Sequence, residues 1–214
     1  MGGIFFKMGL FRKFINQTRK PEGFLGRVML NGMSFGHARI ADWAMSLLNI
    51  PDPVEIAELG CGNGRDAGVL LKKYPSSKLT AVDYSPLSVK KTKANNMKMV
   101  EAGRLTVIEG DVSDLKLQAE KFDLATAFET IYFWPDLEKC FRNVAGILKS
   151  GGYFMIVSES DGEDKITAWF KKRIDGMNTY TPKELETKLK SAGFSEIKVE
   201  HHKKFAWTMV LAKK

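Results

Sequence analysis

The feature that most constrains the fold is a glycine-rich turn that directly follows a short apolar run. Residues 54–59 form the run, and Gly60, Gly62 and Gly64 alternate with other residues immediately after it. Glycine lacks a Cβ and adopts turn conformations that other residues resist, so the backbone at this turn can approach a ligand closely. We therefore expect a strand that ends in a ligand-binding turn.

Acidic residues accompany this turn and recur at two later points of the chain. Glu58 lies two residues before Gly60, which favours a ligand that carries a cationic ammonium group. Asp83 and Asp111 each end another strand-like segment. Open α/β sheets bind ligands at the carboxyl ends of their strands, so we expect the three carboxylates at one edge of a sheet.

From residue 54 onward, short apolar runs alternate with segments of helical periodicity. This alternation is typical of a parallel sheet with crossover helices. Strands are expected over residues 54–59, 79–82, 105–108, 122–127, 153–157, 197–199 and 205–211. Helices are expected over residues 67–74, 85–103, 136–149 and 181–193. The third of these is expected to stop at Gly151-Gly152, and His201-His202 is expected to form a solvated turn.

The N-terminal segment has a different character. A helix is expected over residues 38–48, whereas residues 27–33 are less regular. A short amphipathic helix through Phe11, Phe14 and Ile15 is a further expectation. We divide the chain into an N-terminal helical cap, residues 1–50, and an α/β domain, residues 51–214.

The glycine turn, with Glu58, Asp83 and Asp111 at separate strand ends, resembles the class I S-adenosylmethionine-dependent methyltransferases. The resemblance is to small-molecule enzymes with a methyltransferase-11/25-like domain, and it covers residues 54–214. It implies a Rossmann-like seven-stranded sheet of order 3-2-1-4-5-7-6, with strand 7 antiparallel and helices on both faces. The competing NAD-dependent dehydrogenase fingerprint requires a glycine where this chain has Arg65, which disfavours that class.

The resemblance implies S-adenosylmethionine as cofactor, S-adenosylhomocysteine as product and no metal. Glu58 would favour the ammonium group, and Asp83 would accept hydrogen bonds from both ribose hydroxyls. Asp111 would accept a hydrogen bond from the adenine amino group. The other implied cofactor contacts are Gly60, Cys61, Gly62 and Gly64 in the turn, Tyr84 and Val112 beside the adenine, and Glu129 beside the methionine.

Methyl transfer from a sulfonium is an in-line displacement, which needs a base only when the acceptor must lose a proton. His37 and Glu129 are the candidates for catalysis, although the sequence shows no compelling dyad. His37 could instead have a structural role at a helix start. The residues expected to line an acceptor cavity are His37, Trp43, Tyr132 and Trp134, with core packing as the alternative for the three aromatic side chains.

Absent motifs and the charge distribution favour a small organic acceptor. Residues 128–134 lack the Asn/Asp-Pro-Pro-aromatic motif of amino-methylating nucleic-acid enzymes, and two cysteines indicate no metal site. The net charge of +8 is concentrated in residues 1–27 and 198–214, so no basic channel crosses the domain and nucleic acid is not the expected partner. Contact of the basic N-terminus with a membrane surface stays open.

The expected function is therefore methyl transfer from S-adenosylmethionine to a small organic acceptor, by a cytoplasmic monomer or homodimer. Two alternatives stay open. One is an RNA- or protein-modifying methyltransferase that uses the basic termini. The other is a protein that binds S-adenosylmethionine without catalysis.

Overall fold

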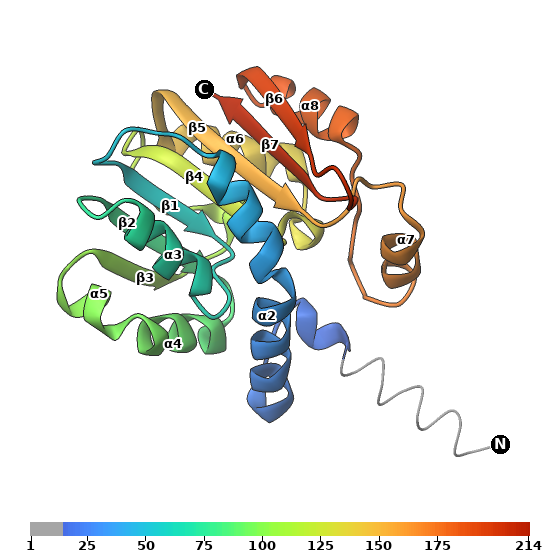
Figure 1. Cartoon of the computed structure of the whole chain (residues 1–214), viewed down its shortest axis with the longest axis horizontal. Coiled ribbons are helices and arrows are strands. Elements are labelled where there is room, and N and C mark those ends of the chain that lie inside the picture. Colours follow the sequence, from blue (N-terminus) through green and yellow to red (C-terminus); the bar gives the residue numbers. More distant parts are fainter. Residues whose placement is uncertain (1–14) are drawn as a thin grey trace.

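The computed structural model describes residues 15–214, which form a seven-stranded sheet with helices on both faces (Figure 1). The strand order is β3-β2-β1-β4-β5-β7-β6, as the sequence resemblance implies. The bounds of the strands are β1 Glu55–Leu59, β2 Lys78–Asp83, β3 Leu105–Glu109, β4 Phe122–Phe128, β5 Leu148–Ser158, β6 Ser195–His201 and β7 Thr208–Lys213.

The first five strands pair in parallel and β7 is antiparallel to both of its neighbours. Parallel strands need crossover connections, which the helices between them supply. The central strands β1 and β4 are buried almost throughout because helices cover both of their faces. The carboxyl ends of β1 to β5 consequently meet at one edge of the sheet.

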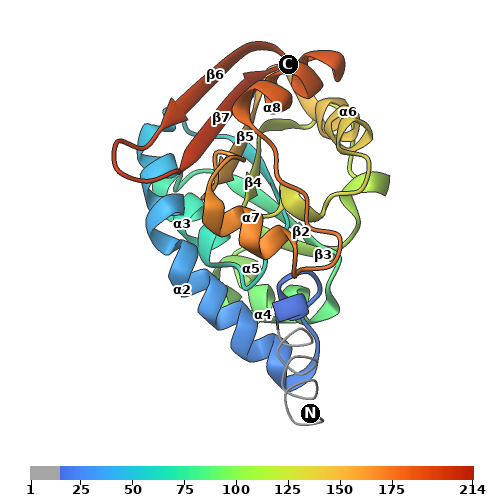
Figure 2. The same ribbon diagram turned by 90° about the vertical axis from the view of Figure 1, so that its right-hand side faces the viewer.

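Two hydrophobic clusters lie on the two faces of the sheet. One contains side chains of α6 (Leu137–Ile147) and α8 (Pro182–Ser191), and the other contains side chains of α2 (Gly23–Leu47) and α3 (Arg65–Lys73). Figure 2 shows α2 running obliquely past the carboxyl edge of the sheet. The remaining elements are α4 Pro86–Asn95, α5 Met97–Glu101, α7 Lys165–Lys171, and the short 3-10 turns η1 Asn16–Thr18, η2 Val112–Asp114 and η3 Ile131–Phe133.

Helix starts follow the capping signals of the sequence. The Ser85 hydroxyl accepts a hydrogen bond from the Ser88 N–H, and Pro86 occupies the first turn of α4. Thr181 and Glu184 form a reciprocal capping box at the start of α8. Both of these expected helix starts are confirmed.

Three expected element bounds are wrong. Helix α6 ends at Ile147 and β5 begins at Leu148, so Gly151-Gly152 lies inside a strand, where a bulge between Phe122 and Leu124 of β4 accommodates the irregular pairing. The helix expected to run to residue 103 is divided at Asn96 into α4 and α5.

The third correction concerns the N-terminal segment. Helix α2 begins at Gly23 and includes residues 27–33, which the sequence indicated as less regular. Its glycines allow close contact, since a Cβ on Gly26 would lie 2.7 Å from the Pro21 carbonyl carbon. The helix expected through Phe11 and Phe14 lies outside the described residues except for Ile15. Among residues 15–214, no helix has the length and apolar character that crossing a membrane would require.

Candidate functional site

A cavity of about 530 Å³ lies at the carboxyl edge of the sheet, between the strand ends and α2. It lies where open α/β sheets bind their ligands. Eleven of the residues singled out from the sequence line it. They are His37, Gly60, Cys61, Gly62, Asp83, Tyr84, Asp111, Val112, Glu129, Tyr132 and Trp134.

The glycine turn after β1 forms part of the cavity floor. All three glycines have positive φ, at +85° for Gly60, +56° for Gly62 and +78° for Gly64. A Cβ on Gly60 would lie 2.3 Å from the Thr130 hydroxyl oxygen, and one on Gly64 would lie 2.6 Å from the Asn96 amide nitrogen. Gly64 packs behind the turn as the N-cap of α3, whereas Gly62 faces the cavity. A side chain therefore has no room at Gly60 or at Gly64. At Gly62 there is space, and glycine is favoured there only because φ is positive.

Asp83, at the end of β2, is held by backbone donors on both carboxylate oxygens. One oxygen accepts from the Gly62 N–H at 2.9 Å and the other from the Ser85 N–H at 2.9 Å. Burial raises the pKa of Asp83, and these two donors act in the opposite direction. The carboxylate still faces the cavity, so each oxygen keeps acceptor capacity for a ligand.

Glu58 lies beneath the glycine turn and is only 2% exposed. Its Oε2 atom is buried without a hydrogen-bond partner among the described residues. Burial raises the pKa of Glu58 well above its ordinary value, and the charges of Asp66 and Asp83 raise it further. A buried acceptor without a donor is costly, so this atom marks a place where a ligand's donor would be stabilised.

Asp66, on the first turn of α3, is a cavity residue that the sequence reasoning missed. Arg65 binds it at 2.6 Å and also binds Asp42 of α2 at 2.6 Å. Burial raises the pKa of Asp66, while Arg65 lowers it. The signal was present in the chain, since Asp66 occupies the second position of the helix that follows the glycine turn.

The end of the cavity beside β2 and β3 is formed by Tyr84, Asp111 and Val112. The Tyr84 hydroxyl donates to the Arg19 carbonyl oxygen, which fixes the ring against the N-terminal segment. Asp111 is exposed and accepts from the Ser113 N–H at 2.8 Å as the N-cap of η2. Val112 is buried. This end offers one acidic edge and one apolar surface to a planar group.

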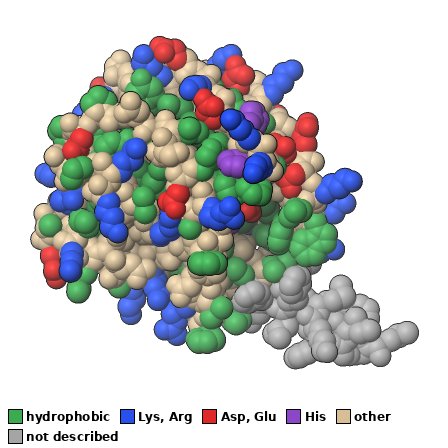
Figure 3. Space-filling model, viewed as in Figure 1, with side chains coloured by type: hydrophobic (Ala, Val, Ile, Leu, Met, Phe, Trp, Pro, Cys, Tyr) green, Lys and Arg blue, Asp and Glu red, His purple; other side chains and the backbone are tan. Residues whose placement is uncertain are grey.

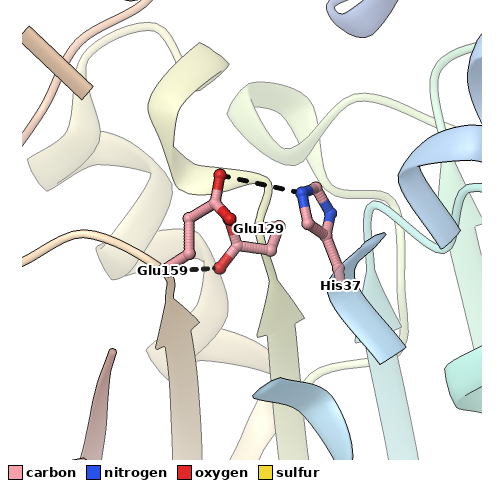
Figure 4. A group of neighbouring side chains, drawn as sticks. All are labelled: His37, Glu129 and Glu159. Carbon is pink, nitrogen blue, oxygen red and sulfur yellow. Dashed lines mark hydrogen bonds and ion pairs between the residues drawn. The ribbon is translucent and has the colours of Figure 1, made fainter. Parts of the chain in front are cut away.

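The opposite end contains His37, Glu129 and Glu159, which come from α2 and from the ends of β4 and β5 (Figure 4). Glu129 has φ +53°, which is uncommon for a residue with a side chain and concentrates at ligand sites. Its carboxylate accepts from the Glu159 N–H at 2.5 Å and from the Tyr132 hydroxyl at 3.1 Å. His37 Nε2 lies 3.8 Å from Glu159 Oε1.

Glu129 and Tyr132 share a buried polar environment. Burial raises the pKa of Glu129 well above its ordinary value, and the nearby Glu159 charge acts in the same direction. Burial also raises the pKa of Tyr132, whose hydroxyl shares a 2.6 Å hydrogen bond with the Ser158 hydroxyl. A cation placed between Glu129 and Glu159 would favour both ionised carboxylates.

The ligand atoms of His37, Glu129 and Glu159 lie within 4.8 Å of one another, which is close enough to consider a metal ion. Both Glu129 oxygens already accept hydrogen bonds, and Glu159 is half exposed. We call His37, Glu129 and Glu159 the acid–imidazole cluster, and we assign no metal ion to this cluster.

Trp43 is the cavity-lining expectation that the structure places elsewhere. It lies on the outer side of α2, where its ring contacts His202 with 5.5 Å and Trp207 with 6.2 Å between ring centroids. His202 also stacks on Phe205, while His201, Lys203 and Lys204 are exposed, so the turn is solvated as expected and also carries an aromatic cluster. Trp134 does line the cavity, and it also packs against Phe154 in the core.

The wall above the acid–imidazole cluster is mostly apolar. Met29, Leu30 and Met33 of α2 line one side, and Phe170 of α7 lines another with Ile174 and Met177 beyond it. Sequence reasoning did not indicate the α7 region, because residues 159–177 show no helical periodicity strong enough to be recognised. The cavity thus joins an acidic floor at the strand ends to an apolar wall.

These features fit a ligand with a cationic group, a ribose and a planar base. An unpartnered Glu58 oxygen, a turn without Cβ atoms and the acceptor capacity of Asp83 correspond to S-adenosylmethionine better than to a dinucleotide with its anionic phosphates. The fold and the site together resemble those of the class I S-adenosylmethionine-dependent methyltransferases.

The comparison with protein families leads to the same class. Residues 57–156 match the family described as "Methyltransferase domain". This match begins in β1 and ends in β5, so it contains the glycine turn, Asp83, Asp111 and Glu129. Residues 57–156 of the chain are accordingly similar to a methyltransferase domain.

Among curated proteins, the chain is 26% identical over 149 residues to 2-methyl-6-phytyl-1,4-hydroquinone methyltransferase 1, chloroplastic, of Oryza sativa subsp. japonica. The alignment covers 69% of this chain and 43% of that relative. It is 27% identical over 129 residues to malonyl-[acyl-carrier protein] O-methyltransferase of Priestia megaterium, covering 60% of this chain and 44% of the relative. The chain thus spans less than half the length of these relatives.

Among solved structures, phosphoethanolamine N-methyltransferase 2 of Haemonchus contortus in complex with S-adenosyl-L-methionine superposes with a TM-score of 0.70. The two are 17% identical, and the match covers 81% of this chain and 52% of that chain. At this identity the similarity establishes the fold alone.

Proposed function

We propose that this chain transfers the methyl group of S-adenosylmethionine to a small organic acceptor. The observation that supports this most strongly is the continuous cavity in which a glycine turn and buried carboxylates adjoin an apolar compartment. The cofactor supplies an electrophilic methyl carbon on a sulfonium when it is bound. The protein has to bind it, orient the acceptor and exclude water.

The donor compartment comprises the glycine turn and the acids around it. In this proposal Glu58 stabilises the ammonium group and Asp83 accepts hydrogen bonds from the ribose hydroxyls. Asp111 and Val112 bind the edge of the adenine, and Tyr84 packs on its face. Gly60, Cys61, Gly62 and Gly64 shape the backbone at the methionine and ribose, with Cys61 itself buried against Thr92.

The acceptor compartment lies between α2, η3 and α7. Tyr132, Trp134, Phe170 and Met33 give it an apolar surface, so the acceptor in this proposal is largely hydrophobic. The similarity to a hydroquinone methyltransferase supports an acceptor of this kind. Glu129 stands between the two compartments and orients the reacting groups through its fixed hydrogen bonds.

His37 is the proposed proton acceptor when the nucleophile is a hydroxyl. Its imidazole lies in the cavity beside Glu129, and Glu159 at 3.8 Å would stabilise the imidazolium once the proton has been transferred. An acceptor that attacks without losing a proton would not need this step.

The test is donor binding followed by transfer. We expect calorimetry to detect S-adenosylhomocysteine and S-adenosylmethionine binding, and no binding of NAD. Methyl-labelled donor incubated with the protein and a metabolite extract should then yield a labelled small molecule. Donor binding without any labelled product in metabolite, RNA or protein fractions would instead favour the non-catalytic binding protein.

The same methyl label distinguishes the alternative, methylation of RNA or protein, from methylation of a small molecule. Label in RNA, together with a steep loss of affinity with salt, would support the alternative over the small-molecule proposal. The assay should use the full chain, because its basic residues lie at the two ends.

A further inference from the structure

The outer face of α2 carries large hydrophobic side chains that are exposed. Phe24 is 70% exposed, Phe35 is 87% exposed, and Val28 and Leu25 are also exposed. Phe24, Val28 and Phe35 are separated by four and seven residues, so they form one stripe along the helix. The cavity-facing side of the same helix carries Leu30. The amino-terminal half of α2 is therefore apolar on both its inner and its outer side.

Helix α7 repeats this arrangement on the other side of the cavity. Thr167 and Phe170 line the cavity, whereas Ile166 is 72% exposed and Trp169 is 42% exposed. Figure 3 shows hydrophobic surface in the region of α7 and at the lower end of α2. We call the outward side chains Phe24, Leu25, Val28, Phe35, Ile166 and Trp169 the α2–α7 rim.

The charges within the α2–α7 rim are basic. From residue 23 to residue 41, α2 contains Arg27 and Arg39 and no carboxylate. Helix α7 contains two lysines and no carboxylate, and Lys172 and Arg173 follow it. Two of these cations lie over exposed rings, with Arg27 6.0 Å from the Phe24 centroid and Arg173 3.8 Å from the Trp169 centroid.

Three acidic residues occur just before α7, of which Asp161 and Asp164 bind neighbouring groups and Glu163 is exposed. The Asp164 carboxylate accepts from the Thr167 N–H as the helix N-cap and also binds the Ser160 hydroxyl. The Asp161 carboxylate accepts from the N–H groups of Glu163 and Asp164. The charge that α7 presents beyond its cap is therefore positive.

We propose that the α2–α7 rim docks on an anionic lipid bilayer and holds the cavity against the membrane surface. Exposed apolar side chains next to Arg and Lys are what an interfacial helix needs, since the apolar groups enter the acyl boundary while the cations pair with lipid phosphates. A helix that is apolar on both sides is otherwise found buried. Both rim helices also line the cavity, so a hydrophobic molecule could pass from the bilayer to the acceptor compartment.

Vesicle binding tests the membrane-docking proposal without requiring turnover. A failure to bind vesicles is therefore distinct from a failure of the methyltransferase proposal. The full chain is sedimented with vesicles of phosphatidylcholine alone and of phosphatidylcholine with phosphatidylglycerol. We expect binding to the anionic vesicles, little binding to the neutral ones, and a loss of binding as salt is raised. Absence of binding to anionic vesicles at low ionic strength would overturn the proposal.

A double variant that introduces two negative charges tests whether the α2–α7 rim makes the contact with the vesicle. Phe35→Glu with Ile166→Glu should reduce the affinity for anionic vesicles by about tenfold or more, because it removes two inserted side chains and adds two repelled charges. Met97→Glu is the matched control, since Met97 is 59% exposed on α5, away from the rim. It should bind as the unmodified chain does.

Both rim positions are exposed, so circular dichroism and melting temperature should match those of the Met97→Glu control. If the folded double variant binds vesicles as well as the unmodified chain, the contact lies in another part of the chain and the proposal for the α2–α7 rim is refuted. Light scattering provides a second check. If the unmodified chain is a dimer that does not bind vesicles, and the double variant is a monomer, a second copy of the chain covers this surface. That result would also refute the proposal.

Discussion

The two compartments of the cavity are built by different parts of the chain. The donor compartment rests on strand ends and on the turns that directly follow them, so each of its residues is fixed by the sheet. The acceptor compartment is closed by α7, which has one buried residue, Thr167, and by the amino-terminal half of α2, in which only Gly26 and Leu30 are buried. The first compartment is preorganised by the fold, whereas the second depends on segments that can differ among proteins with the same sheet.

This difference separates binding from transfer. Substitutions in the donor compartment should change donor affinity, and substitutions in the acceptor compartment should change turnover while donor affinity stays constant. The four predictions below test that separation in order of expected effect.

His37→Gln should have the largest effect. If the imidazole takes the acceptor proton, kcat should fall by about 10²- to 10⁴-fold, the range of a lost general base. Donor affinity, measured by calorimetry, should not change, because His37 lies in the acceptor compartment. His201→Gln is the matched control, since His201 is exposed on β6. Equal loss of donor affinity and turnover would show that the two compartments are not separable at this residue.

Gly60→Ala should come next. The new methyl group would meet the Thr130 hydroxyl in a backbone conformation at φ +85°, so we expect the free energy of unfolding to fall by about 2–4 kcal/mol. Chemical denaturation measures it, and donor affinity should fall as well because the turn must shift. Gly146→Ala in α6 is the control, since nothing lies within 4 Å of its added Cβ. Equal stability of the two variants would contradict the tight turn.

Asp83→Asn should weaken donor binding by about 1–3 kcal/mol, as expected for the loss of a charged hydrogen-bond acceptor. The amide cannot accept from the Gly62 N–H, the Ser85 N–H and two ribose hydroxyls at once. Calorimetry with S-adenosylhomocysteine measures the change, and Asp114→Asn on the exposed η2 turn provides the control. Unchanged donor affinity in the folded variant would remove Asp83 from the donor compartment.

Glu58→Gln should have the smallest effect on the free energy of unfolding at any single pH. It should mainly alter how steeply that free energy changes with pH. The folded protein raises the pKa of Glu58 above its ordinary value of 4.5, so between these two pKa values the folded state binds more protons than the unfolded state. Stability from this group is therefore lost as pH rises above 4.5, by up to about 1.4 kcal/mol per pH unit.

The Glu58→Gln variant should show a flatter decline of the free energy of unfolding with rising pH, together with weaker donor binding. Denaturation at several pH values measures the slope, with Glu101→Gln on exposed α5 as the control. An identical slope in Glu58→Gln and the unmodified chain would show that Glu58 is ionised in the folded protein without a penalty.

The same contrast explains what could be predicted from the sequence. Strand ends and the residues around the glycine turn were predictable because they depend on local signals, namely apolar runs, turn glycines and acids at fixed positions. The sheet order followed only from the resemblance to a known family. Asp66 was missed although it follows the turn directly, because its role depends on the Arg65 ion pair and on burial rather than on a pattern.

The acceptor compartment was less predictable, since tertiary contacts decide it. Trp43 has the spacing of a core-facing residue, and it does pack against the core beside α2 instead of lining the cavity. Its ring also contacts the β6–β7 connection, whose aromatic residues are distant in sequence. Four glycines made the amino-terminal half of α2 look irregular, whereas the contact of Gly26 with Pro21 uses the missing side chain. Residues 165–171 form a helix too short to show a period.

Helix α2 is anchored unevenly. Ile40, Ala41, Ala44 and Met45 are all buried near its carboxyl end, and Arg65 clamps Asp42 at the same level. Only Gly26 and Leu30 are buried in its amino-terminal half. The helix is thus packed more tightly at its carboxyl end, beside the glycine turn, than along its amino-terminal half, which borders the apolar compartment. Substitutions in the amino-terminal half of α2 should therefore reshape the apolar compartment while the sheet keeps its packing.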